Sequence, residues 1–405
     1  MKLLLPVLLS LSLPLAAAVD SEFSGNLEAQ GRYSWNNELA KRDLFQDWDS
    51  GDFYMVYGNL NEKIKFDGSR IEANWFLRGT ASELYTPPDA PFALGSRDPY
   101  FASQIFTFPN ELVARDLFNL QYKKRDGVFQ LESVLNKLLL EYDIGDHRLT
   151  VGRMYINYGL GEIFNPVNPF NQPTGLTAIS QVAQGNDGIS FNNYYTEKLT
   201  VQLFLLGDRK KSDAEEDKIQ KTVWVRAEVQ PNSDLQLDLV AGEDQDRYKA
   251  GGQLSYRLSE AMVFTQFLYQ TKYISDVPSN TLIDAMLGFD QQLTAKWHLR
   301  FEGGYQEKNQ FVTLDSFGER FLPTEYFVAI ANQYDVHPLV KLSGTVINDL
   351  KSGFTYVIAK GTLDLGNDTE FDAFAFVPAA RGDAADNDAQ KLVTTDIGAA
   401  LRVFF

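Results

Sequence analysis

Apolar and polar residues alternate without interruption from Phe23 to Trp35. The odd positions are apolar, aromatic or glycine, and the even positions, which include Glu28 and Arg32, are polar. A period of two predicts a β-strand that separates two different environments. Strands of globular proteins usually have about 5–6 residues. Because a tilted strand needs about 9–11 residues to cross a bilayer, this longer stretch indicates a membrane-spanning strand.

The same alternation returns at residues 71–78, 222–229, 248–258, 297–305 and 393–405. Turn-forming residues mark eight short connections, at 67–68, 145–146, 196–198, 231–234, 259–260, 294–296, 335–338 and 366–369. Between them lie nine mostly longer connections, at about 36–50, 81–128, 158–186, 208–219, 243–247, 272–280, 308–322, 349–353 and 378–390.

This order of connections predicts an all-β fold, a single antiparallel transmembrane β-barrel of about eighteen strands. Bacterial barrels have short periplasmic turns and longer extracellular loops, so both termini are expected on the periplasmic side. Residues 115–137 could hold an extra hairpin inside the second long connection. A barrel of sixteen or of twenty strands is therefore an alternative to eighteen.

Both ends of the chain carry signals of export. Lys2, the apolar residues 3–15 and the alanines at 16–18 predict a signal peptide over residues 1–18 and a barrel over residues 19–405. The last strand, with Leu401, Val403 and Phe405 on one face, resembles the assembly signal of outer-membrane barrels. That resemblance implies the outer membrane of a Gram-negative-type bacterium, with membrane lipid, lipopolysaccharide and the barrel-assembly machinery as partners.

Composition agrees with this interpretation and excludes several functions. Aromatic residues make up 13% of the chain, which suits the aromatic girdles of a membrane barrel. A net charge of −17 argues against nucleic acid as a partner. The chain has no cysteine and three histidines, and their spacing supports neither a catalytic triad nor a metal cluster. We therefore expect neither an enzyme nor a bound cofactor or metal.

One local motif runs from Val151-Gly152-Arg153 through Tyr158-Gly159-Leu160-Gly161 to residues 164–171, which read FNPVNPFN. It resembles a stretch that follows an upward strand in several porin-like families, and the whole chain is similar to a single-chain outer-membrane porin. The resemblance implies a channel for small hydrophilic solutes or ions. By strand parity Arg153 faces lipid, so we expect either a place near the outer rim or a bulge at Gly152 that turns it inward.

The long connection at 158–186 contains apolar patches and several prolines, and Glu162 is its only charged residue. This composition favours a buried loop, and one interpretation is a loop folded into the lumen, where it narrows the pore. The alternatives are a loop packed over the rim or against a neighbouring subunit, which leaves a homo-oligomer open. The connection at 81–128 has the same alternatives, and it could also plug the lumen.

Inward-facing positions carry both signs of charge, which fits a water-filled lumen with a transverse field or a lumen closed by salt bridges. The net negative charge lies largely in the predicted loops, where it fits solvated or lipopolysaccharide-facing charge or a mild cation preference. The candidate pore-lining residues are Arg153, Glu162, Asn165, Asn168, Arg32, Glu72, Arg78, Arg226, Arg300 and Glu302. The alternative function is a non-conducting barrel that serves as scaffold or sheath for a partner, such as a periplasmic electron-transfer protein or a surface polysaccharide.

Overall fold

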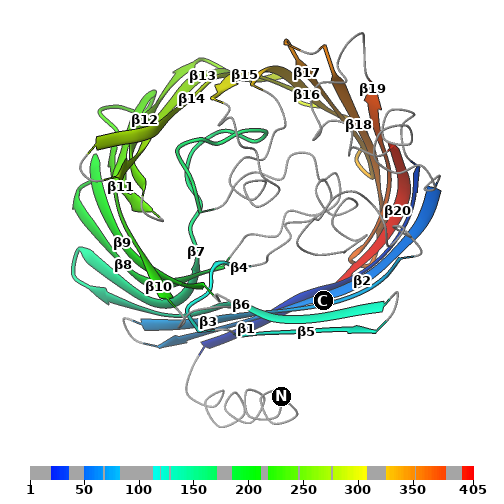
Figure 1. Cartoon of the computed structure of the whole chain (residues 1–405). Helices are drawn as coiled ribbons and strands as arrows, with labels where there is room; N and C mark the ends of the chain where they lie inside the picture. The colour runs from blue at the N-terminus through cyan, green and yellow to red at the C-terminus, as the bar shows by residue number, and fades with distance from the viewer. Residues whose placement is uncertain are drawn as a thin grey trace.

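The computed structural model describes residues 20–35, 50–66, 69–82, 113–118, 120–126, 129–170, 185–210, 218–244, 247–274, 277–307, 325–351, 353–379 and 395–405. These residues form one closed barrel of β-strands (Figure 1). Within them, no helix is long and apolar enough to cross a membrane. The expected signal peptide, residues 1–18, lies outside the described residues.

Twenty strands are present in the described residues, and all but β4 and β5 form an antiparallel ring of eighteen. The ring contains β1 (Asp20–Trp35), β2 (Ser50–Phe66), β3 (Ser69–Ser82), β6 (Phe129–Ile144), β7 (His147–Tyr155), β8 (Gly185–Thr196), β9 (Leu199–Lys210), β10 (Lys218–Val229), β11 (Leu235–Asp244), β12 (Arg247–Leu258), β13 (Ala261–Ile274), β14 (Val277–Thr294), β15 (Trp297–Gln306), β16 (Tyr326–His337), β17 (Val340–Asp349), β18 (Thr355–Gly366), β19 (Thr369–Ala379) and β20 (Thr395–Phe404). The predicted barrel is confirmed.

The last strand closes the barrel against the first. β20 pairs with β1 in a register that sets Val403 opposite Leu27, and Phe405 exchanges two backbone hydrogen bonds with Gly25. The Phe405 ring lies 6.4 Å from the ring of Phe23 on the same edge of the barrel. The C-terminal residues therefore complete the ring of hydrogen bonds that a membrane barrel needs.

The period-two pattern explains the two faces of the wall. On β10, Val223 and Val225 are exposed on the outside, whereas Trp224 and Arg226 are buried on the lumen side. Aromatic residues lie near both ends of the strands: the exposed Trp297 and Tyr334 pair beside a short turn, and the half-buried Tyr305 pairs with the exposed Tyr326 at the opposite end. An apolar band between two aromatic girdles is the surface that lipid requires.

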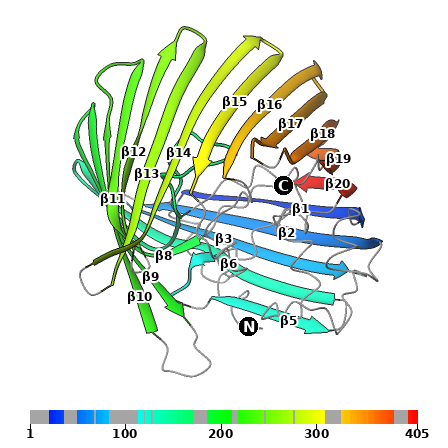
Figure 2. The ribbon, with the colours of Figure 1, turned by 45° about the horizontal axis from the view of Figure 1, so that its top comes forward.

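The described short connections agree with seven of the eight predicted turns, and the predicted turn at 67–68 lies outside the described residues. Two-residue turns at 145–146, 197–198, 259–260, 295–296, 338–339 and 367–368, and a five-residue connection at 230–234, all lie at one end of the barrel, called here the short-turn end. The expected extra hairpin also exists: β5 (Gln121–Asp126) pairs with β6, but it adds no strand to the ring (Figure 2). The strand number therefore stays at eighteen.

β7 leaves the wall early, and this departure positions the site. β7 has 9 residues whereas its neighbour β6 has 16, so β7 pairs with β6 only over 138–144. β5 pairs with the remaining part of β6, over residues 129–134. After Tyr155 the chain turns into the lumen (Figure 1). We call residues 156–170 the lumen segment; residues 171–184 and most of the predicted loop at 81–128 lie outside the described residues.

Candidate channel constriction

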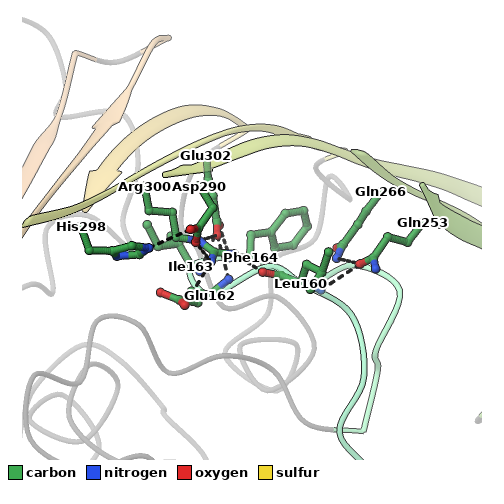
Figure 3. A network of polar contacts seen from close by, with 10 residues as sticks. All are labelled: Leu160, Glu162, Ile163, Phe164, Gln253, Gln266, Asp290, His298, Arg300 and Glu302. Atoms are coloured by element: carbon green, nitrogen blue, oxygen red, sulfur yellow. Dashed lines mark hydrogen bonds and ion pairs between the residues drawn. The ribbon is translucent and has the colours of Figure 1, made fainter. Parts of the chain in front are cut away.

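Glu302, on the lumen side of β15, anchors the lumen segment. Its carboxylate accepts hydrogen bonds from three consecutive backbone N–H groups, those of Glu162 (2.8 Å), Ile163 (3.0 Å) and Phe164 (3.2 Å) (Figure 3). Glu302 is fully buried. A buried carboxylate is costly unless charged and polar donors satisfy it, so these contacts hold the segment firmly against β15.

Arg300 supplies the positive charge of this anchor. Its Nε donates to Glu302 (2.7 Å) and its Nη1 donates to Asp290 on β14 (2.8 Å) and to Glu162 (3.0 Å). Its Nη2 donates to the carbonyl of Leu160. The guanidinium also lies 5.0 Å from the centre of the Phe264 ring, within the range of a cation–π interaction. Arg300 therefore ties two wall strands to the lumen segment.

Polar side chains on neighbouring strands extend this network along the wall. The Oε1 of Gln253, on β12, accepts a hydrogen bond from the backbone N–H of Leu160 (2.8 Å). At the other side, His298 Nε2 lies 2.7 Å from the Oδ1 of Asp290 (Figure 3). The segment is thus held by polar side chains of β12 and β15, with Asp290 of β14 behind Arg300, which places it across the lumen from its origin at β7 (Figure 1).

Two asparagines give the lumen segment its internal shape. Asn165 Nδ2 donates to the carbonyl of Tyr158 (2.7 Å), and Asn168 Nδ2 donates to the carbonyls of Ile156 (3.3 Å) and Tyr158 (3.2 Å). Gly159 has a φ of +84°, and a Cβ there would lie 2.3 Å from Asn165 Oδ1. The two candidate asparagines are therefore buried and bind the segment's own backbone.

Apolar side chains of the segment pack into the lumen wall. Phe164 meets Phe327 edge to face at 5.7 Å, in a cluster that also contains Ile163 and Met286. Phe170 meets Trp224 edge to face at 5.6 Å, in a second cluster. Because these rings are buried, the hydrophobic effect adds to the polar anchor and stabilises the segment inside the barrel.

The structure brings six candidates together at the lumen segment, including Asn165 and Asn168, and places the other four elsewhere. Glu162, Arg300, Glu302 and Arg226 all contact the lumen segment or belong to it, since the Arg226 guanidinium lies 5.1 Å from the Tyr158 ring centre. Glu72 pairs with Lys137 and Arg78 pairs with Glu132, both between β3 and β6. The side chain of Arg32 lies outside the described residues, and Arg153 belongs to a separate cluster.

Three residues that matter here were not among the candidates: Asp290, Gln253 and Phe264. Strand parity places each of them on the lumen side of its strand, so the pattern identifies their face. It does not identify their height on the wall relative to the lumen segment, which depends on the stagger of the barrel strands.

Three lumenal arginines are each surrounded by several carboxylates. Arg226 contacts Glu228 and Asp238, Arg300 contacts three carboxylates, and Arg402 contacts Glu28 (2.7 Å), Glu370 (3.1 Å) and Asp372 (3.5 Å). The contacts of Arg226 with Asp238 and of Arg300 with Asp290 join neighbouring strands. The Glu162 side chain is 59% exposed while Arg300 is 5% exposed, so the carboxylate is the charge that the lumen meets at the segment. Within the described residues, no group of His, Cys, Asp and Glu could hold a metal ion.

The sequence matches no protein-family model and no curated protein. Solved structures share its fold, however. Pseudomonas aeruginosa OccK9 (OpdG) aligns with a TM-score of 0.57 and 9% identity over 95% of this chain and 98% of that chain. Acinetobacter baumannii OccAB4 gives 0.54 and 9% over 95% and 97%, and Pseudomonas aeruginosa OpdK with vanillate gives 0.51 and 10% over 95% and 98%. At such identities the similarity establishes the fold alone, which is a closed antiparallel β-barrel like that of these proteins.

Proposed function

We propose that the protein is an outer-membrane channel through which small hydrophilic solutes or ions diffuse, with residues 156–170 as its constriction. The observation that carries the proposal is the anchoring of Glu162, Ile163 and Phe164 to Glu302 inside the barrel. An eighteen-stranded barrel is wide enough for an aqueous channel. A segment fixed within it narrows the passage without the need for a plug domain.

The rigidity of the segment is what makes it a filter. Polar contacts to β12 and β15 hold one part of it, and the Phe170–Trp224 contact holds another. Because both parts are fixed to the wall, the space beside the segment keeps a constant size. Solutes that fit pass by diffusion, and Glu162 is the charge that they meet.

The neighbours support a channel rather than an enzyme, because they are porins. The OpdK structure contains vanillate, a carboxylate. In this chain Arg226, Arg300 and Arg402 already contact two or three carboxylates each. A negatively charged solute would therefore meet little uncompensated positive charge at these arginines, so we expect neutral and cationic solutes to be favoured.

The proposal includes how the protein reaches its membrane. We expect removal of residues 1–18 on export, engagement of the terminal strand with Leu401, Val403 and Phe405 by the assembly machinery, and contact with lipopolysaccharide. A homo-oligomer remains a prediction. Mass spectrometry of the protein purified from outer membranes would locate its first residue, which is expected to be Val19.

Single-channel recording tests the proposal. The refolded protein, with the folded barrel verified by its heat-modifiable migration in SDS gels, should give current steps of stable size in a planar bilayer. A folded barrel that leaves the bilayer silent would instead favour the non-conducting scaffold or sheath. Liposome swelling with neutral solutes of increasing size would then set the limit that the constriction imposes.

A further inference from the structure

Arg153, the residue two places before the end of β7, is the centre of a buried ion cluster. Its Nε and Nη2 bind both oxygens of Asp187 on β8 at 2.6 Å and 2.7 Å. Nη2 also donates to Asp116 (2.6 Å) and Nη1 donates to the carbonyl of Leu135 on β6 (3.0 Å). The side chains of Arg153 and Asp187 are both 0% exposed. One guanidinium therefore joins β6, β7, β8 and the chain around residue 116.

This cluster lies on the outer face of the wall. The β7–β8 register sets Arg153 opposite Asp187 and Val151 opposite Ile189, with no register shift between the pairs. Val151 is 41% exposed and Ile189 is 42% exposed, so their shared side faces lipid. Arg153 thus keeps the outward parity expected from the sequence. It is shielded neither by the rim nor by a bulge, but by another part of the chain.

Residues 116–118 cover the ion pair from the lipid side. The backbone N–H groups of Leu117 (2.8 Å) and Phe118 (2.9 Å) donate to Asp187 Oδ2. A Cβ on Gly207, whose neighbour on the same face is the exposed Leu205, would lie 3.2 Å from the Leu117 side chain. Two charges that would be costly in hydrocarbon are therefore enclosed by protein.

The cluster lies where the strand pairing of the barrel wall changes. Beyond Tyr155, β7 no longer continues the ring, and residues 113–118 and 120–126 bridge from β9 to β6 in its place. The bridge is made by the short parallel pairing of β4 (Val113–Arg115) with β8, by a hydrogen bond from Arg209 N–H to the Asp116 carbonyl (3.1 Å), and by one from Leu135 N–H to the Leu120 carbonyl (3.1 Å). Backbone N–H and C=O groups in hydrocarbon must form hydrogen bonds with protein. The contacts of this cluster provide such bonds where β7 has left the ring.

We propose that Arg153 is a positioning residue of the channel: with Asp187 and Asp116 it clamps the wall where β7 leaves it, and so fixes the root of the lumen segment. The proposal rests on the proposed function. Only Met154 and Tyr155 separate Arg153 from Ile156, the first residue of the segment. A displacement of Arg153 is therefore transmitted to the segment directly. Arg153 controls the pore without lining it.

The test compares Arg153→Met with the matched control Arg148→Met. Arg148 is on the same strand and binds Asp143 (2.7 Å) near the short-turn end, away from the lumen segment. Arg153→Met should give a fluctuating open-channel current at an unchanged reversal potential, because no lumenal charge is removed. Arg148→Met should give a steady current. Arg153→Lys, which keeps the positive charge, should give a current that fluctuates less than that of Arg153→Met. A folded Arg153→Met with the wild-type current trace would overturn the proposal.

A second readout separates this proposal from the channel itself. The chain contains no cysteine, so Glu162→Cys provides a single thiol on the segment. If the wild type does not conduct, the proposed function fails, but Arg153→Met should still change the rate at which a hydrophilic thiol reagent modifies residue 162 several-fold. An unchanged modification rate at residue 162 would contradict the proposal that Arg153 fixes the lumen segment.

If Arg153→Met does not fold, the double variant Arg153→Cys with Asp187→Cys replaces it. The two residues are directly opposite on adjacent strands, a spacing that suits a disulfide. The oxidised form should give a steady current, and reduction should make it fluctuate. Identical traces before and after reduction would overturn the proposal.

Discussion

Glu302 on β15 and Ile163 in the lumen segment are joined by a 3.0 Å hydrogen bond, although 139 residues separate them in the sequence. The bond runs from the backbone N–H of Ile163 to a carboxylate that is fully buried. Because the same carboxylate accepts from the two adjacent N–H groups, it fixes the backbone of the segment rather than one side chain. Glu302 is therefore a central anchor of the lumen segment, beside the contacts from Arg300 and Gln253.

Replacing Glu302 should release the segment. Glu302→Gln removes the charge that Arg300 and three N–H groups share, and loss of one partner of a buried ion pair costs about 3 kcal/mol. Urea unfolding, followed by gel migration, should show this loss, and the single-channel current should become larger and less steady. Glu228→Gln is the control, because Glu228 is a lumenal carboxylate that binds Arg226 instead. Equal behaviour of the two variants would contradict the anchoring role.

Glu162 should give the channel a preference for cations. Its carboxylate is the exposed charge of the segment, and it is the only charged residue between Arg153 and Asp187 in the sequence. In a potassium chloride gradient the wild type should therefore show a reversal potential that favours potassium. Glu162→Gln should reduce this potential, and Glu162→Lys should reduce it further. Glu370→Gln, which changes a carboxylate bound to Arg402 on the wall, should have a smaller effect.

Gly159 should tolerate no side chain. Gly159→Ala combines a φ of +84° with a Cβ placed 2.3 Å from Asn165 Oδ1, whose amide is held by Tyr158. Gly145→Ala is the control, since Gly145 has a φ of +57° in a short turn with no atom near the new Cβ. The control should cost about 1–2 kcal/mol from its backbone alone. Gly159→Ala should cost more in urea unfolding and should also alter the channel current, which the control should leave unchanged.

Phe170 should anchor the C-terminal end of the lumen segment. It is fully buried against Trp224 and Phe204, and truncation of a buried phenylalanine costs about 3–5 kcal/mol. Phe170→Ala should therefore destabilise the barrel and enlarge its current. Phe118→Ala, at a half-exposed ring on the lipid side, is a matched truncation that should change both measurements less. A larger effect of Phe118→Ala than of Phe170→Ala would show that the packing of the lumen segment does not determine the width of the passage.

The sequence predicts the strands of the barrel and their order well, because strand parity and turn chemistry are local properties. Alternation at residues 23–35 predicts β1, and the order of short and long connections predicts eighteen strands. The low charge of residues 158–186 favours burial of that stretch, and residues 158–170 lie in the lumen. The extra hairpin within 115–137 is also present as β5 and β6.

The contacts between distant segments were not predictable in the same way. Parity puts Glu302 on the lumen side but gives no reason to select it over other inward charges. Parity also gives the outward direction of Arg153, yet nothing in its neighbourhood along the chain points to residues 116–118 as its cover. Both contacts depend on how the barrel closes and on where β7 leaves it, which are properties of the whole ring.

The most direct test of the constriction is the current through a channel that carries one thiol at its centre. Glu162→Cys, reconstituted in a planar bilayer, is treated with a bulky hydrophilic thiol reagent during recording of single channels. Since the residue 162 side chain faces the lumen beside the anchor at Glu302, modification should reduce the current of each channel in one step. A steady current that is unchanged after complete modification would contradict the account.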